Sequence, residues 1–167
     1  QRLSRGLGDV YKRQLLVYSL LFEDSTYLNR WSKRLPNAKI GNSYLNFIAS
    51  HDGIGMRPAE GYLSKEKLSE LFKRLKKNGG QLSYRKVQGS SKKVYEANIT
   101  LFNAFQKTDY DKKGRFFLER YISAHAIMIA FEGVPAIYFN SLFGTSNDKY
   151  KYIISVSYTH LTLPTTT

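Results

Sequence analysis

The chain has 167 residues, with 26 lysines and arginines against 13 aspartates and glutamates, and it contains no cysteine. The lack of cysteine excludes disulfide bridges and thiolate metal sites and agrees with a reducing compartment, so we predict a cytoplasmic protein. No apolar run approaches the roughly 18 residues that a transmembrane helix needs, so we predict no membrane partner.

The two ends of the chain differ from its middle in pattern and composition. Residues 1–14 show no hydrophobic period and no apolar core of a signal peptide, and residues 155–167 are rich in threonine. The strings RGLGDVYKRQ and VSYTHLTLPT within these ends resemble translated sequencing adapters. We therefore predict that both ends are adapter-like and non-native, and that residues 15–154 carry the function. An ordinary frayed terminus is the alternative.

The first predicted elements are helices. Residues 15–31 have the apolar spacing of a helix, or of a helix pair broken near Asp24 and Ser25, either of which could cap the second piece. Pro36 marks a loop. A short, continuously apolar strand is then predicted over residues 44–50, of the kind that a parallel sheet covers on both faces.

Positive charge is concentrated on the next helix. Residues 64–77 combine leucines at helical spacing with lysines and arginines, and Ser64 and the run 78–80 supply an N-cap and a glycine stop. The basic residues therefore indicate the solvated side of an amphipathic helix. The sequence has no zinc finger, helix-turn-helix or RNA-binding aromatic signature, so we predict no nucleic-acid partner.

The second half of the chain alternates strands and a helix. Residues 81–87 and 94–99 have strand character, and the polar run 88–92 between them predicts a hairpin turn. Residues 115–131 have helical spacing and are followed by a glycine and a second apolar strand over residues 134–139. Helix, glycine stop and short strand form the αβ step of a βα repeat, so the fold class is α/β.

A His51-Asp52 pair directly follows the first apolar strand. Two strongly polar side chains at a strand end favour a position that faces a polar ligand. In barrels of alternating strands and helices, ligands bind at the carboxyl ends of the strands. The pattern alone leaves a solvated Asp-Gly turn as an equal alternative.

Longer motifs favour the ligand site. The motif F-x-x-x-H-D, ending at Asp52, and the motif G-x-P-x-I-Y, ending at Tyr138, resemble two signatures on strands seven and eight of the α-amylase superfamily barrel. The strings HDGIGMRPAEG, VYEANITLFNAF and GVPAIYFNSLFGTSND resemble the sucrose phosphorylase and glucosylglycerate phosphorylase branch of glycoside hydrolase family 13. The resemblance covers roughly residues 15–152.

The resemblance implies a partial (β/α)8 TIM barrel. A complete barrel needs about 250 residues, so residues 15–154 are expected to supply its carboxyl-terminal part: strands seven and eight, their helices, and an inserted helix–hairpin excursion. The family's nucleophile and acid/base lie on the fourth and fifth strands. We therefore expect the fragment to be inactive alone.

The same resemblance assigns roles at the strand end. Asp52 would stabilise the transition state by binding the distorted sugar ring, and His51 would bind a neighbouring glucose hydroxyl. A packed histidine is the alternative for His51. His125, inside the apolar helix, is predicted to be a packed core histidine. No metal and no cofactor are predicted, with inorganic phosphate as the co-substrate.

Three further residues are predicted to bind substrate. Arg57 suits the glycerate carboxylate or phosphate, with a salt bridge to Glu60 as the competing interpretation. Tyr95 and Glu96 match a loop of sucrose phosphorylases that binds the acceptor sugar or phosphate, and an exposed hairpin pair is the alternative. Glutamate at position 96, in place of glutamine, argues against sucrose as the substrate.

The predicted function is that of a fragment of a retaining glycoside phosphorylase. The parent enzyme would transfer an α-glucosyl unit from a small-molecule glucoside, such as glucosylglycerate, to phosphate and release glucose 1-phosphate. An α-glucosidase or transglucosidase of the same superfamily is the alternative enzyme. A basic, non-catalytic binding module is the alternative from another class.

Overall fold

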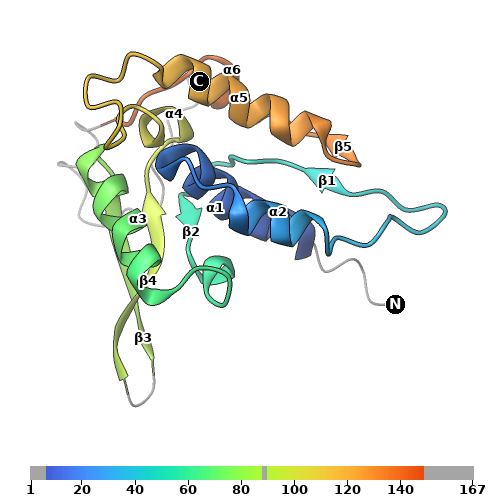
Figure 1. The fold of residues 1–167 in the computed structure, drawn as a ribbon, viewed down its shortest axis with the longest axis horizontal. Helices are drawn as coiled ribbons and strands as arrows, with labels where there is room; N and C mark the ends of the chain where they lie inside the picture. The colour runs from blue at the N-terminus through green and yellow to red at the C-terminus, as the bar shows by residue number, and fades with distance from the viewer. Residues whose placement is uncertain (1–6, 88–89, 149–167) are drawn as a thin grey trace, which may run out of the picture.

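The computed structural model describes residues 7–87 and 90–148 (Figure 1). In chain order the elements are α1 (Leu7–Phe22), α2 (Thr26–Ser32), β1 (Leu45–Asn46), β2 (Ile54–Gly55), the 3-10 helix η1 (Arg57–Ala59), α3 (Lys65–Lys77), β3 (Gln81–Val87), β4 (Ser90–Asn98), α4 (Leu101–Ala104), α5 (Phe117–Ala130), β5 (Val134–Pro135) and α6 (Phe139–Leu142). None of the described helices is long and apolar enough to cross a membrane.

Strands β1 and β5 form a parallel pair, as a βα repeat requires. Leu45 is paired with Val134, and the backbone N–H of Val134 donates to Tyr44 at 2.7 Å. Both strands are shorter than predicted, because the chain turns away from the ladder after residues 46 and 135. Phe139 in particular begins the short helix α6 and does not end a strand, which corrects the prediction.

The amino-terminal helix pair is confirmed. The chain reverses between α1 and α2 at Glu23, whose φ is +55°, and the carboxylate of Asp24 accepts from the Thr26 N–H at 3.0 Å. The Ser25 side chain makes no capping bond, so Asp24 fills that role. Helix α1 also extends across the predicted boundary at residue 14. This continuity does not test the origin of residues 1–14, which stays a prediction.

The predicted helix and hairpin are both present. The Ser64 side chain accepts from the Lys67 N–H, and Gly79, at φ +92°, ends α3 in the left-handed conformation that glycine adopts without strain. Strands β3 and β4 are antiparallel. Residues 88 and 89 of the predicted turn lie outside the described residues, and residues 90–92 belong to β4, which begins four residues earlier than predicted. β2 adds to β4, with Ile54 opposite Ala97, and gives the order β2-β4-β3.

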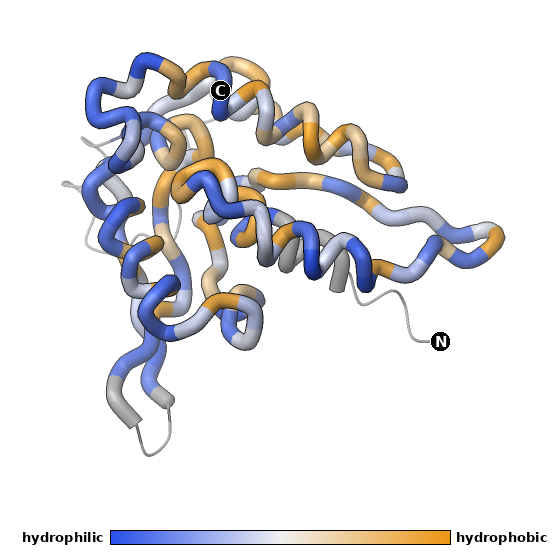
Figure 2. The backbone as a smooth tube through the Cα atoms, in the orientation of Figure 1, coloured by the Kyte–Doolittle hydropathy of each residue, from blue (hydrophilic) through white to orange (hydrophobic). Residues whose placement is uncertain are grey.

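Helix α1 lies at the centre of the core. Leu15, Val17, Tyr18 and Leu21 are all 2% exposed or less, and α1 contacts α2, α5, η1 and both small sheets. The hydrophobic segments of the chain converge on this helix, whereas the β3–β4 hairpin projects away from it with polar residues (Figure 2). The core therefore fixes the end of β1, where His51 and Asp52 follow, against the base of the hairpin.

Candidate active site

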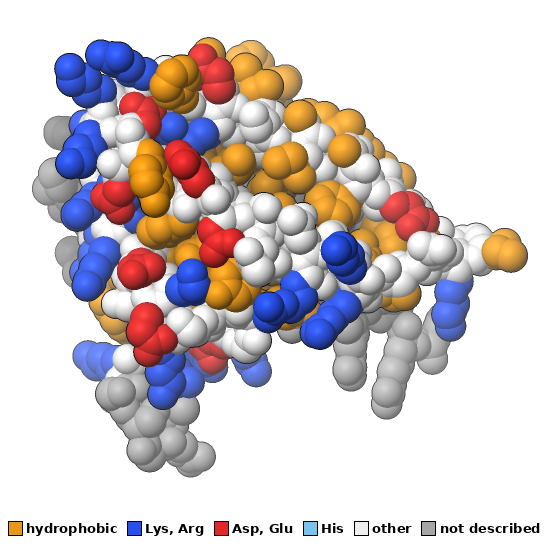
Figure 3. All heavy atoms as spheres, viewed as in Figure 1, with side chains coloured by type: hydrophobic (Ala, Val, Ile, Leu, Met, Phe, Trp, Pro, Cys, Tyr) orange, Lys and Arg blue, Asp and Glu red, His pale blue; other side chains and the backbone are white. Residues whose placement is uncertain are grey.

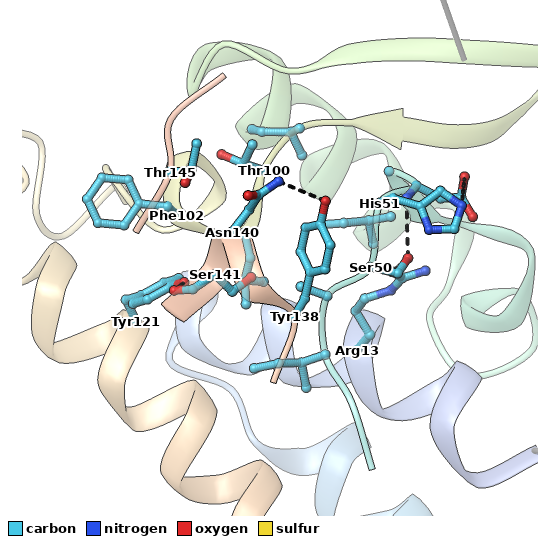
Figure 4. A pocket seen from close by; sticks show the side chains of 17 residues that line it. Arg13, Ser50, His51, Thr100, Phe102, Tyr121, Tyr138, Asn140, Ser141 and Thr145 are labelled. Atoms are coloured by element: carbon cyan, nitrogen blue, oxygen red, sulfur yellow. Dashed lines mark hydrogen bonds and ion pairs between the residues drawn. The ribbon is translucent and has the colours of Figure 1, made fainter. Parts of the chain in front are cut away.

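A small cavity lies at the carboxyl ends of the two parallel strands. It is lined by residues after β1, by the segment that leads into α4, and by residues after β5 (Figure 4). Its volume is about 40 Å³. Sites for small organic ligands usually measure about 300–1,000 Å³. The described residues therefore do not enclose a sugar by themselves.

His51 and Asp52 both line this cavity. The His51 Nε2 atom lies 3.6 Å from the Asp52 Oδ1 atom, and the two side chains are 67% and 45% exposed. The backbone N–H of Asp52 donates to the Ser50 hydroxyl at 3.3 Å. Both side chains are therefore accessible to a ligand.

Gly53 brings the His-Asp turn against β4. A Cβ atom at this position would lie 2.5 Å from the carbonyl oxygen of Ala97 and 3.0 Å from the Cα atom of Asn98. Any other residue would therefore push the turn away from the strand. Gly53 therefore allows the backbone of the turn to approach the backbone of β4 closely. The Asp-Gly turn pattern in the sequence did not reveal this contact.

Glu96 is buried at the centre of the small sheet. It is 8% exposed and lies on β4, between Gly55 of β2 and Ser83 of β3. Burial lowers the pKa of the Arg13 guanidinium, and the charges of Glu96 and Asp52 oppose that shift. Glu96 and Asp52 therefore both lie near enough to Arg13 to raise its pKa, so these two predicted site residues share one cation. Arg13 itself belongs to the segment predicted to be non-native.

Tyr95 lies on the other face of β4. Successive side chains of a strand point to opposite faces, and Tyr95 is 51% exposed where its neighbour Glu96 is buried. The Tyr95 carbonyl accepts from the Met56 N–H at 2.8 Å and so holds η1 to the sheet. Neither Tyr95 nor Glu96 lines the cavity, and Arg57 does not line it either. The structure therefore separates the two residues that the sequence predicted as a pair.

Arg57 does not form the salt bridge that was predicted as an alternative. The Glu60 carboxylate lies 3.4 Å from Arg85 and 3.7 Å from Lys93, both on the hairpin. Arg57 begins η1, is exposed, and has no ion-pair partner among the described residues. The salt bridge to Glu60 is therefore wrong, because the folded hairpin supplies two nearer cations that are distant in sequence.

The far wall of the cavity contains residues that the sequence did not assign. Tyr138, which ends the G-x-P-x-I-Y motif, accepts a hydrogen bond from the Asn140 amide at 2.8 Å, and both residues line the cavity (Figure 4). The Tyr121 hydroxyl donates to the Ser141 carbonyl, and burial raises the pKa of Tyr121. Tyr138 could have been identified from the sequence by its position at the end of the G-x-P-x-I-Y motif.

His125 is packed, as predicted. Its Nδ1 atom lies 2.9 Å from the Tyr121 carbonyl, and the two rings are 4.6 Å apart. Within residues 7–87 and 90–148, no group of three or more His, Cys, Asp or Glu side chains could hold a metal ion. The predicted lack of a metal and of a cofactor stays a prediction.

No protein-family model matches the chain. The chain is 32% identical over 134 residues to the glucosylglycerate phosphorylase of Escherichia coli (strain K12). The aligned residues cover 80% of this chain and 24% of that relative. The chain is also 34% identical to the glucosylglycerate phosphorylase of Spirochaeta thermophila, over 80% of this chain and 22% of that protein.

The fold agrees with these relatives. The crystal structure of sucrose 6F-phosphate phosphorylase from Thermoanaerobacter thermosaccharolyticum superposes with a TM-score of 0.68 at 22% identity, over 84% of this chain and 26% of that chain. The parallel β1–β5 pair with α5 thus matches part of a (β/α)8 barrel, and the predicted fold class is confirmed. The chain is thus homologous to glucosylglycerate and sucrose phosphorylases, and it spans about a quarter of the length of the relatives it matches.

Proposed function

We propose that the protein carrying this chain is a retaining phosphorylase, which transfers an α-glucosyl unit from a glucoside to phosphate. The observation that carries the proposal is the His51-Asp52 pair, held at the end of a parallel strand and pressed by Gly53 against the strand that bears Glu96. Among its relatives, those named glucosylglycerate phosphorylase suggest a glucoside with an acidic aglycone.

In this proposal the described residues form the wall that binds sugar. Asp52 accepts hydrogen bonds from glucose hydroxyls and binds the distorted ring more tightly than the relaxed ring, which accelerates the chemical step. His51 binds an adjacent hydroxyl. The nucleophile and the acid/base, which retaining chemistry also requires, would come from strands that precede this part of the barrel.

The aglycone and phosphate would bind near η1 and the hairpin. Arg57 is exposed and has no competing carboxylate among the described residues, so its planar guanidinium is available to glycerate or phosphate. The buried Glu96 carboxylate repels both anions and therefore suits the hydroxyls of the aglycone. Tyr95 would need to turn from the opposite face of β4 to reach the same ligand.

A phosphate-dependence assay tests this function. The full-length protein, recovered from its gene, should release glucose 1-phosphate from glucosylglycerate only when phosphate is present. Free glucose formed at the same rate without phosphate would favour the α-glucosidase or transglucosidase alternative. Retention on heparin or DNA that salt abolishes, with no sugar turnover, would favour a basic binding module.

A further inference from the structure

The side chain of Asn147 bonds both ends of the β3–β4 hairpin. Its Nδ2 atom donates to the carbonyl of Gly79, two residues before β3, at 3.2 Å. Its Oδ1 atom accepts from the backbone N–H of Thr100, two residues after β4, at 2.7 Å. An asparagine side chain offers one acceptor and one donor group, and here each is used on a different segment. Asn147 therefore joins the segment that enters the hairpin to the segment that leaves it.

The two ends of the hairpin are also in direct contact. A Cβ atom at Gly80 would lie 3.1 Å from the Cβ atom of Ile99, which is tighter than ordinary van der Waals contact. The side-chain amide of Asn78 donates to the carbonyl of Ala104 at 2.7 Å and so binds the end of α3 to α4. A shift of this base would therefore move both strands of the hairpin together.

A second set of hydrogen bonds ties Asn147 to the start of α4. Its backbone N–H donates to the Oδ1 atom of Asn103 at 2.7 Å, and the same Oδ1 atom accepts from the Thr100 hydroxyl at 3.0 Å. The Thr100 hydroxyl in turn accepts from the Asn103 N–H at 3.3 Å and so caps α4. These bonds hold Thr100 through its backbone and its side chain at once.

This junction adjoins the cavity. Thr100 and Thr145 both line it, and the N–H of Thr145 donates to the carbonyl of Asn140, another lining residue, at 3.0 Å. Figure 4 shows Thr100, Asn140 and Thr145 close together. Asn147 itself does not line the cavity. It can therefore act on a ligand only through the residues that it holds.

We propose that Asn147 is a positioning residue for glucoside binding, an inference that rests on the proposed function. Its three hydrogen bonds fix the wall formed by Thr100 and Thr145 before a ligand arrives. The turn that carries Asp52 is held to the same unit, because Gly53 packs it against β4. Without these bonds, the glucoside would have to order the wall on binding, and that cost would weaken its affinity.

The kinetic effect of such a role differs from that of a loss of stability. The ordered wall is needed equally in the ground-state complex and in the transition state, so its loss raises KM and leaves kcat nearly unchanged. Partial unfolding instead lowers the concentration of active enzyme, which reduces the apparent kcat at an unchanged KM. Measuring kcat and KM separately therefore distinguishes a positioning residue from one that only stabilises the fold.

Three variants of the full-length protein test the assignment. Asn147→Ala removes the side-chain bonds to Gly79 and Thr100 and should raise KM for glucosylglycerate about tenfold, with kcat within about twofold of the unmodified value. The segment 99–105 should exchange its amide hydrogens about tenfold faster. Asn147→Asp keeps the acceptor for Thr100 and should change KM and exchange less. Asn42→Ala, at an exposed position in the loop before β1, is the control and should change neither.

An unchanged KM in Asn147→Ala, or a lower kcat at an unchanged KM, would overturn the positioning role. An Asn147→Asp variant as impaired as Asn147→Ala would contradict the assignment of that role to the bond with Thr100. KM is measured for whichever reaction the full-length protein catalyses, phosphorolysis or hydrolysis. Glucose released without phosphate, together with a raised KM in Asn147→Ala, would therefore refute the proposed function and support the positioning role.

Discussion

Two regions differ in how they bury apolar side chains: the helix–hairpin excursion, residues 64–98, and the outer side of α5 and α6, here called the α5–α6 face (Figure 3). The α5–α6 face consists of the exposed residues Leu118, Ile122, Ile129, Phe139, Leu142 and Phe143. In the excursion, Leu71 and Leu75 are 0% exposed. Four lysines of α3 are exposed, whereas Lys67 is half-buried against Tyr18 and Arg74 is buried, so the predicted solvated basic side is only partly present. In the second region, α5 buries one side and leaves Leu118 and Ile122 exposed on the other. Helix α3 therefore completes its apolar burial within the described residues, whereas α5 carries exposed apolar residues beside its buried side.

The largest expected difference concerns the isolated chain. When residues 15–154 are expressed alone, we expect an aggregated or molten product. The cause would be the exposed α5–α6 face together with the edge of β5 that, among the described residues, has no strand beside it. Size-exclusion chromatography and a thermal melt followed by near-UV circular dichroism check this. A soluble monomer with a sharp cooperative melt would show that the two regions do not differ in this way.

Matched leucine substitutions sharpen the comparison. Leu71→Ala empties a fully buried position and should cost about 2–5 kcal/mol, as large-to-small core changes do. Leu118→Ala, at a position 48% exposed, should change stability by no more than about 0.5 kcal/mol in the chain alone. Hydrogen exchange of α3 and β4 amides, below the onset of aggregation, measures both. Equal losses of protection would contradict the separation.

A third prediction asks whether function depends on the turn beside the excursion. If Asp52 stabilises the transition state as proposed, Asp52→Asn in the full-length protein should lower kcat about a hundredfold or more, by analogy with loss of an oxyanion-hole donor. Glu70→Gln, at an exposed position on α3, is the control and should leave kcat unchanged. A loss below about tenfold would reduce Asp52 to a turn residue.

Arg57 tests the substrate preference of the same region. Losing a hydrogen bond to a charged group costs about 1.5–3 kcal/mol, so Arg57→Ala should raise KM for glucosylglycerate about ten- to a hundredfold. KM for the neutral glucosylglycerol should change far less. Arg85→Ala, which removes a cation that is already paired with Glu60, is the control. Equal effects on both glucosides would point to phosphate as the ligand of Arg57.

The smallest effect concerns pH and the start of α5. Asp111 accepts from the N–H groups of Phe116 and Arg115, both at 2.9 Å, and lies 3.0 Å from Arg120. These contacts lower the pKa of Asp111 from 3.8 to about 2. The hydrogen bond from the Phe116 N–H contributes most, followed by those from Arg115 and Arg120. Its contribution is therefore complete above about pH 4 and is lost as pH falls through about 2.

Amide exchange at the start of α5, followed between pH 5 and pH 2, measures this loss. The Asp111→Asn variant should exchange faster at pH 5 and show a flatter dependence on pH. Parallel profiles for the two proteins would mean that Asp111 does not stabilise the helix start.

Much of the fold followed from local pattern. Helix α3 was predicted from its leucine spacing, its Ser64 cap and the glycines after it, and the hairpin from two short apolar runs around a polar turn. These signals act between residues close in sequence, where backbone preference and side-chain capping decide the structure. The placement of His51 and Asp52 beyond a parallel strand was predicted in the same way, although β1 ends at Asn46, four residues earlier than expected.

Long-range contacts were not predictable in this way. The pairing of β2 with β4 and the separation of Tyr95 from Glu96 depend on how distant segments meet. Glu60 pairs with Arg85 and Lys93 because the folded hairpin brings them nearer than Arg57. A sequence pattern says which residue types are present but not which of several cations lies closest.

The sequence by itself determined the resemblance to the phosphorylases, the α/β alternation and the His51-Asp52 turn, because each depends on motifs of a few neighbouring residues. Only the tertiary structure decided that Gly53 presses this turn onto β4, that Glu96 is buried near Asp52, and that one side of α5 stays uncovered. The physical reason is that burial and charge pairing are set by the packing of segments far apart in the chain.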